Sequence, residues 1–279
     1  MREELTSMIR SAVTISLVPQ ARGGPFVYWD DLPAALRAAS ELNFSAVEIF
    51  APGPEAIDSG ALARILHDHG LKLAAVGTGA GWLIHKLQLC DADATRRSQA
   101  QDFIRRMIDW GGPLGAPAII GSMQGHWSDE VPRETALAFL TDALSELGEH
   151  ARQYQVPLIY EPLNRYETNL VNRLDDGVAL LKTLSNLNVR LLADLFHMNI
   201  EEVDLTAALR SAGASVGHVH FVDSNRRPAG CGHLDLGPIA SALKAINYRG
   251  YVSAEALPWP DSQKAAEHTM QAFQKFFVA

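Results

Sequence analysis

The sequence is short of cysteine, of long apolar runs and of clustered basic residues, and each shortage excludes a class of protein. Cys90 and Cys231 are its two cysteines, and they form neither a CxxC pair nor a disulfide framework. No apolar run approaches the length needed to cross a membrane. The net charge of −8 and the lack of a Lys/Arg cluster disfavour nucleic acid and anionic membranes as partners.

The N-terminal segment lacks the long apolar core that a secretory signal peptide needs. Its sequence, MREELTSMIRSAV, begins with several charged residues. We therefore expect no signal peptide. Together with the two unpaired cysteines, this predicts a cytoplasmic protein with reduced thiols.

The sequence does contain a regular alternation of short apolar runs and longer helical segments. The apolar runs predict eight strands, at residues 12–18, 46–50, 71–76, 116–121, 156–160, 189–194, 216–222 and 251–255. The segments between them predict helices that end at Leu42 and His69, and helices at 95–110, 132–153, 175–187, 203–212, 236–246 and 262–277. The glycine-rich stretch 77–94 is predicted to be a long loop.

This alternation determines the expected fold. Strands alternating with helices predict an α/β protein with a parallel sheet covered by helices. Eight such units predict a single (β/α)₈ TIM barrel, with residues 1–279 as one domain. A doubly wound open sheet would need a glycine-rich nucleotide-binding turn after its first strand, and VPQARGGPF lacks that spacing.

Ionisable residues stand at the ends of the last four predicted strands. They are separated by roughly 30 residues, about one strand-plus-helix unit. The carboxyl ends of barrel strands meet at one face, where the active sites of such barrels lie. We therefore expect four side chains to converge there: Glu161, Asp194, His220 and Glu255.

Three carboxylates and one imidazole at one point predict a divalent-cation site. Any one of these residues, taken alone, is more often a helix cap or an ion-pair partner. Because His218 and His220 share a strand face, one of them is expected to be a packed, hydrogen-bonded histidine. Ligands rich in oxygen favour Mn²⁺, Mg²⁺ or Co²⁺ over structural zinc, and we expect one Mn²⁺ ion per chain.

Three strings carry a resemblance to a known family: EPLNRYETN, ADLFHMNIEE and GHVHFVDSNR. They resemble the ketose 3-epimerases of the D-tagatose and D-psicose type, within the xylose-isomerase-like superfamily of sugar isomerases and epimerases. The resemblance is dense from Pro157 to Glu255 and weak before it, so it leaves the sugar open.

The resemblance implies roles for particular residues. Glu161, Asp194, His220 and Glu255 match the family's metal ligands, of which Glu161 and Glu255 would also be the catalytic acid/base pair. The substrate-binding residues of the family correspond to Glu167, His197 and Arg226.

Aromatic and histidine residues on the N-terminal loops are further candidates for contacts with the substrate. Trp82 and His85 lie in the predicted loop 77–94, while Phe26 and Trp127 lie on other loops at the same end of the barrel. We expect Trp82 and His85 to contact the substrate, and the other two rings either to stack on it or to close over the core.

These features together predict an isomerase that acts on a small-molecule sugar. One glutamate would remove a proton next to a carbonyl, the cation would stabilise the enediolate, and the second glutamate would return a proton. Two alternatives use the same site: a lyase that eliminates a β-substituent from a 3-keto-sugar, and an endonuclease-IV-like phosphodiesterase. A homo-oligomer, dimer or tetramer, is also expected, with Phe276 and Phe277 as candidate contacts.

Overall fold

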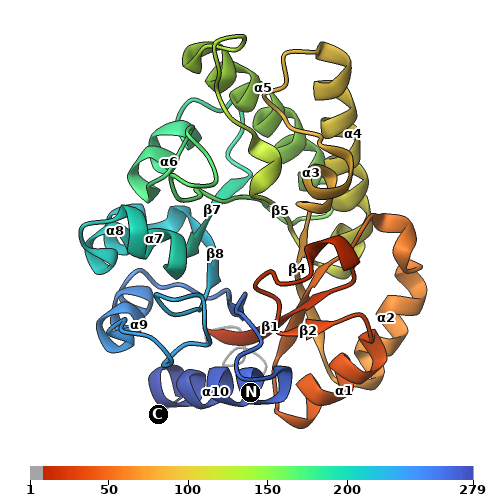
Figure 1. Ribbon diagram of the computed structural model, residues 1–279, viewed down its shortest axis with the longest axis vertical. Coiled ribbons are helices and arrows are strands. Elements are labelled where there is room, and N and C mark those ends of the chain that lie inside the picture. Colours follow the sequence, from red (N-terminus) through yellow and green to blue (C-terminus); the bar gives the residue numbers. More distant parts are fainter. Residues whose placement is uncertain (1–8, 279) are drawn as a thin grey trace.

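The computed structural model describes residues 9–278, and its centre is a closed barrel of eight parallel strands (Figure 1). Each strand pairs with the next, and the last pairs back onto the first, so the barrel has no open edge. The predicted TIM barrel is confirmed. Its strands are β1 Arg10–Ser16, β3 Ala46–Phe50, β4 Lys72–Gly77, β5 Ala118–Ile120, β6 Leu158–Tyr160, β7 Val189–Asp194, β8 Val216–His220 and β9 Tyr251–Ala254.

Helices surround the barrel. A two-residue strand, β2 Tyr28–Trp29, pairs with the carboxyl end of β1. The α-helices are α1 Leu32–Glu41, α2 Ser59–Asp68, α3 Ala80–His85, α4 Ala94–Gly111, α5 Arg133–Arg152, α6 Leu174–Leu181, α7 Leu195–Glu201, α8 Leu205–Ala212, α9 Leu236–Ala245 and α10 Ser262–Phe273. Short 3₁₀ turns are at Pro19–Ala21, Pro54–Ala56, Gly112–Leu114, Ser122–Gln124 and Gly213–Ser215, and a π-helical turn at Gln274–Val278 follows α10.

Two segments in which no helix was predicted contain one, which corrects the sequence analysis. The stretch 77–94 contains α3, which ends at Lys86 in a left-handed conformation. The residues after the sixth predicted strand form α7, because the Asp194 side chain accepts hydrogen bonds from the first backbone N–H groups of that helix. The predicted helix 203–212 starts only at Leu205, and the predicted helix 175–187 ends at Leu181.

Apolar residues fill both the inside of the barrel and the layer between strands and helices. Inside, Ala75, Ile119, Ile159 and Leu192 form one buried cluster contributed by four neighbouring strands. A much larger cluster joins the outer faces of the strands to the helices. Closed packing on both faces holds the strand ends in fixed positions.

Two further predictions concern the termini and membranes. Phe277 is buried against Phe221 and Phe273 of its own chain and offers little surface to a partner chain. Residues 1–8, which carry most of the segment expected not to be a signal peptide, lie outside the described residues. Within residues 9–278, no helix is both long and apolar enough to cross a membrane.

Candidate active site

The barrel brings the four strand-end residues together at its carboxyl face. Asp194 and His220 are the last residues of β7 and β8, while Glu161 and Glu255 directly follow β6 and β9. One ligand atom from each residue lies within 4.8 Å of the others. The four side chains therefore converge as predicted.

His220 is at the centre of this cluster. Its Nδ1 lies 2.9 Å from Asp194 Oδ2, 3.3 Å from Glu255 Oε2 and 3.6 Å from Glu161 Oε1. Burial alone would lower the pKa of His220, but Glu255 and the other carboxylates around it raise that pKa well above its ordinary value. One imidazole nitrogen thus faces three carboxylate oxygens.

These four side chains fit a divalent cation. Glu161 Oε1 is buried and has no hydrogen-bond partner, which is costly unless a cation or a substrate group satisfies it. Three carboxylates and one imidazole are a donor set suited to Mn²⁺, Mg²⁺ or Co²⁺. The residues that would hold the ion are Glu161, Asp194, His220 and Glu255.

Asp194 has two separate tasks, one for each oxygen. Its Oδ1 accepts hydrogen bonds from the backbone N–H groups of Phe196 and His197, at 2.8 and 3.2 Å, and so caps α7. Its Oδ2 faces the cluster, 2.9 Å from His220 Nδ1. Capping therefore fixes both the orientation of the carboxylate and the start of the helix that carries His197.

Arg226 supplies a positive charge on the open side of the cluster. It donates to Glu255, lies 3.1 Å from Asp194 Oδ2, and stacks with its guanidinium carbon 4.7 Å from the centre of the Phe196 ring. Burial opposes its charge, but Asp194 and Glu255 raise the pKa of Arg226, which stays protonated. Arg226, which was predicted to contact the substrate, is therefore also paired with Asp194 and Glu255.

His197 is held by Asn164 and is neutral at pH 7. Asn164 donates to His197 Nδ1 through its side-chain amide at 2.7 Å and through its backbone N–H at 3.2 Å. Its Nε2 lies 3.3 Å from Arg226 Nη1 and 3.8 Å from Glu161 Oε1. Burial lowers the pKa of His197 to about 4. A neutral imidazole at the cavity suits hydrogen bonding to a substrate oxygen.

Glu161 and Glu167, which both line the cavity, have raised pKa values. Burial, together with the charges of Glu255 and Asp194, raises the pKa of Glu161 above its ordinary value. Burial also raises the pKa of Glu167, whose Oε1 accepts from the Asn164 amide at 3.3 Å. A raised pKa is suited to a group that both accepts and returns protons.

A cavity of about 590 Å³ lies directly over the cluster. The metal-site glutamates line it together with most of the predicted substrate-binding residues, namely Glu161, Glu255, Glu167, His197, Arg226 and Trp82. Its far wall is apolar: Phe26 stacks on Phe50 with 4.7 Å between the ring centres, beside Trp82.

Two residues that the sequence placed near the substrate are elsewhere. His85 is exposed at the end of α3 and does not line the cavity, so the structure gives no support for its predicted contact with substrate. Trp127 does not line the cavity either, and its ring N–H donates to the backbone oxygen of Asn169. Trp82 and His85 were both predicted to contact the substrate. Helix α3 directs Trp82 into the cavity and leaves His85 outside it.

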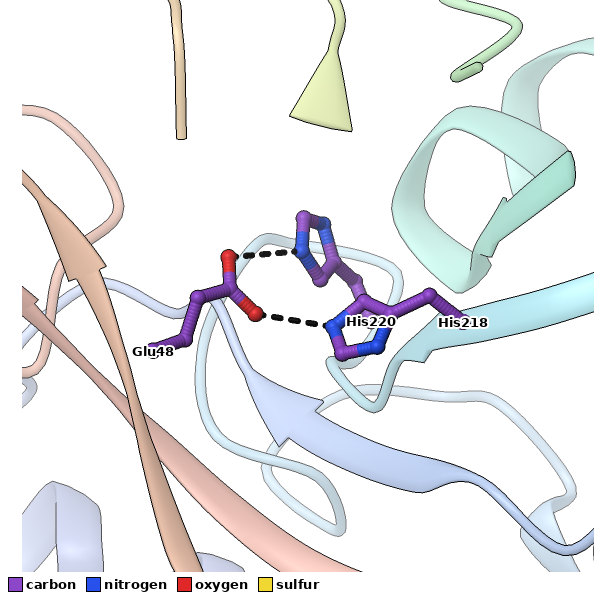
Figure 2. A group of neighbouring side chains, drawn as sticks. All are labelled: Glu48, His218 and His220. Atoms are coloured by element: carbon purple, nitrogen blue, oxygen red, sulfur yellow. Dashed lines mark hydrogen bonds and ion pairs between the residues drawn. The ribbon is translucent and has the colours of Figure 1, made fainter. Parts of the chain in front are cut away.

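Sequence analysis missed two residues that support the cluster. Glu48 lies inside β3 and accepts from both His218 and His220 (Figure 2). A Cβ atom added to Gly121 would lie 2.5 Å from Glu161 Oε2, so glycine is required for the position of that carboxylate. The signal for Glu48 was a charged residue at the centre of an apolar strand, AVEIF. Gly121 had no comparable signal.

Comparison with known proteins gives consistent matches along most of the chain. L-ribulose 3-epimerase of Mesorhizobium japonicum is 31% identical over 230 residues, covering 81% of this chain and 75% of that protein. D-psicose 3-epimerase of Agrobacterium fabrum is 30% identical over 242 residues, covering 82% of each. The crystal structure of D-allulose 3-epimerase from Methylomonas sp. superposes with a TM-score of 0.80 at 22% identity, covering 97% of this chain and 99% of that one.

A family model described as the xylose isomerase-like TIM barrel matches residues 36–276. That match includes seven of the eight barrel strands and all four residues of the carboxylate–histidine cluster. On this evidence the chain belongs to the xylose isomerase-like TIM barrel family.

Proposed function

We propose that the protein is a metal-dependent epimerase of unphosphorylated ketoses, with Glu161 and Glu255 as its two proton-transfer groups. The observation that carries this proposal is the cluster of Glu161, Asp194, His220 and Glu255 beneath a cavity, with Glu161 Oε1 buried and unpaired. Relatives that cover about four-fifths of the chain include L-ribulose 3-epimerase and D-psicose 3-epimerase, which confirms the sequence prediction of an isomerase.

The two glutamates enter the site from strands that are not neighbours. β6 and β9 are separated by β7 and β8 in the closed barrel, so the two glutamates enter the site from different parts of the barrel wall. When bound, the divalent cation supplies Lewis-acid polarisation of the substrate carbonyl and stabilises the negative charge that develops. One glutamate then removes the proton next to the carbonyl, and the other returns a proton to the opposite face of the same carbon.

The charge of the cavity favours a neutral sugar. Arg226 is the only Lys or Arg among the described residues that line it, and its guanidinium is already paired with Asp194 and Glu255. A phosphate group would meet carboxylates without a free cation. His197 and Glu167 provide neutral and anionic partners for sugar hydroxyls instead.

Deuterium exchange tests this proposal together with metal analysis. Purified protein should contain one Mn²⁺, Mg²⁺ or Co²⁺ per chain, lose activity after chelation and recover it when Mn²⁺ is added back. In D₂O, a ketose substrate should gain one deuterium at the epimerised carbon. A panel of ketoses, 3-keto-glycosides and sugar phosphates then identifies the substrate class.

Other outcomes would replace the proposal. Full activity in exhaustively chelated protein would remove the cation from the mechanism. Release of an aglycone from a 3-keto-glycoside would identify a β-eliminating lyase. Several zinc ions per chain together with cleavage of DNA would identify a phosphodiesterase. A cytoplasmic location and the lack of a nucleic-acid partner remain part of the proposal.

A further inference from the structure

A second group of ionisable side chains lies inside the barrel, directly beneath the proposed metal centre. It consists of Glu48 on β3 with His218 and His220 on β8, all buried (Figure 2). Strand register places Glu48 beside Ala75 and His218 beside Leu192, which are both members of the apolar interior cluster. A carboxylate in such surroundings is costly unless both of its oxygens are paired.

Both oxygens of Glu48 are paired, each with a different imidazole. Its Oε2 lies 2.8 Å from His218 Nε2, and its Oε1 lies 3.2 Å from His220 Nε2. Because an ionised carboxylate only accepts hydrogen bonds, both Nε2 atoms must carry protons. The group is satisfied without any ion, unlike the adjacent cluster, where Glu161 Oε1 has no partner. We therefore read it as a hydrogen-bonded support and not as a second metal site.

The proton on His220 Nε2 determines what the other ring nitrogen can do. With Nε2 held protonated by Glu48, Nδ1 is the nitrogen at which a metal ion can bind, in place of the proton shared with Asp194 Oδ2 at 2.9 Å. That atom points at Asp194 Oδ2, Glu255 Oε2 and Glu161 Oε1. Glu48 also lines the cavity, and its direct link to the cluster is the hydrogen bond with His220. His218 holds the second oxygen, so that Glu48 cannot rotate away.

We propose that Glu48 is a positioning residue that fixes the ring orientation and the Nε2–H tautomer of His220, and thereby makes Nδ1 a ligand for the divalent cation. This inference rests on the metal centre of the proposed function and adds a residue that the metal cluster itself does not include. A carboxylate behind a metal-binding histidine also makes the imidazole a stronger ligand, and loss of such a partner typically weakens metal binding about 10–100-fold.

Calorimetric titration of chelated protein with Mn²⁺ tests the proposal without reference to activity. Glu48→Gln keeps the size of the side chain and one acceptor but removes its charge, and its Kd for Mn²⁺ should rise about tenfold. Glu48→Met has a similar volume but no strong acceptor, and its Kd should rise by up to about 100-fold. A Kd within twofold of wild type in folded Glu48→Met protein would overturn the proposal.

Glu202 provides a matched control. Its side chain is also buried and accepts hydrogen bonds, from the backbone N–H of Leu174 at 2.8 Å and from Arg173 at 3.2 Å, but it is not part of either cluster. Glu202→Gln should leave the Kd for Mn²⁺ unchanged. An equal loss of affinity in both Gln variants would mean that general destabilisation causes it, and would overturn a specific role for Glu48.

A measurement on the wild-type protein keeps the proposal testable if the Glu48 variants fail to fold. Long-range ¹H–¹⁵N spectra of protein labelled at histidine, with diamagnetic Zn²⁺ as the probe, should show His220 with a protonated Nε2 and a metal-bound Nδ1. A metal-bound Nε2 would overturn the proposal. Wild-type protein that binds neither Mn²⁺ nor Zn²⁺ would instead remove the metal centre itself, so the two failures are distinguishable.

Discussion

Glu161 and Glu255 should each be a ligand and a base, and glutamine substitutions separate them from their neighbours. Gln keeps one ligand oxygen but cannot accept the substrate proton, so kcat should fall by more than the roughly 10²–10⁴ typical of a lost acid–base group. One variant should still exchange the substrate proton with D₂O without forming product. Rates and exchange are measured by NMR, and near-normal product formation in both metal-loaded variants would assign proton transfer to another residue.

Gly121 should be indispensable because of the space that it leaves for Glu161. In Gly121→Ala, the new methyl group would lie 2.5 Å from Glu161 Oε2, so the carboxylate must move. Both kcat and Mn²⁺ affinity should fall at least about tenfold, in line with the loss of a well-placed ligand. In the control Gly237→Ala, the nearest atoms lie 3.5 and 3.9 Å away, and steady-state kinetics should match wild type.

Single residues differ in how far the sequence reveals them. The four cluster residues were predictable because each one interrupts an apolar strand at its end, and parallel strands end at one face. Glu48 stood out only as a charge within an apolar strand, and its contacts with His218 and His220, inside the barrel, are visible only in the structure. His85 was expected on a loop, but it lies at the end of α3 and does not line the cavity.

At the scale of elements, α7 links the proposed metal site to the substrate cavity. Its N-cap residue, Asp194, uses one oxygen for the helix and the other for the cluster. Asp194→Asn should keep the cap, because Asn is a good N-cap residue, yet bind Mn²⁺ much more weakly. Asp194→Ala should lose both functions.

Hydrogen exchange followed by mass spectrometry separates the two functions of Asp194. Backbone amides at Phe196 and His197 should stay protected in Asp194→Asn and exchange faster in Asp194→Ala, since a lost cap costs about 0.5–2 kcal/mol. Equal exchange in the two variants would show that capping does not depend on this side chain. Asp204→Ala, which removes the cap of α8, is the control away from the site.

Elements were predicted best where they are long or end in strong signals. The eight barrel strands and the long helices α4 and α5 lie close to their expected bounds. The short helix α7 was missed because it begins directly at a strand end and spans less than two turns, which is too short for helical periodicity to show. The same brevity hid α3 within a glycine-rich stretch.

At the scale of the whole molecule, Cys90 should make the free energy of unfolding fall as the pH rises into the alkaline range. Burial raises the pKa of Cys90 from 9.0 to about 12, and its thiol donates to the backbone oxygen of Ala136 at 3.2 Å. The Cys90 thiol loses its proton at lower pH in the unfolded chain than in the folded protein. Its contribution to stability is therefore fully present below pH 9 and is lost as pH rises toward 12.

Urea unfolding at pH 8 and pH 10 in the presence of reductant measures this effect. The free energy of unfolding should fall by about 1 kcal/mol more in wild type than in Cys90→Ser, because one titrating group changes it by about 1.4 kcal/mol per pH unit. Parallel losses in the two proteins would contradict a buried, protonated thiol.

The expected homo-oligomer has a candidate contact near the mouth of the barrel. Val203 is 99% exposed, and Tyr166 is 81% exposed on a loop that the Arg165–Glu201 ion pair joins to α7. Light scattering at micromolar concentration should give the mass of a dimer or tetramer, and Val203→Asp should lower it to that of a monomer. The control Leu187→Asp lies before β7 at the other end of the barrel and should not change the mass. A monomeric wild type would contradict the prediction.

Arg226 and His220 give Asp194 and Glu255 counter-charges that belong to the chain itself, and leave Glu161 Oε1 for the ion. A site whose repulsion is mostly balanced does not need an ion in order to fold. The chain can then fold first and bind the divalent cation afterwards, and one cation can replace another. Which cation is bound in the cell would depend on the concentration of each cation as well as on the affinity of the site, which rises from Mn²⁺ to Co²⁺. One chelated sample should therefore accept Mn²⁺, Mg²⁺ and Co²⁺ in turn without being unfolded in between.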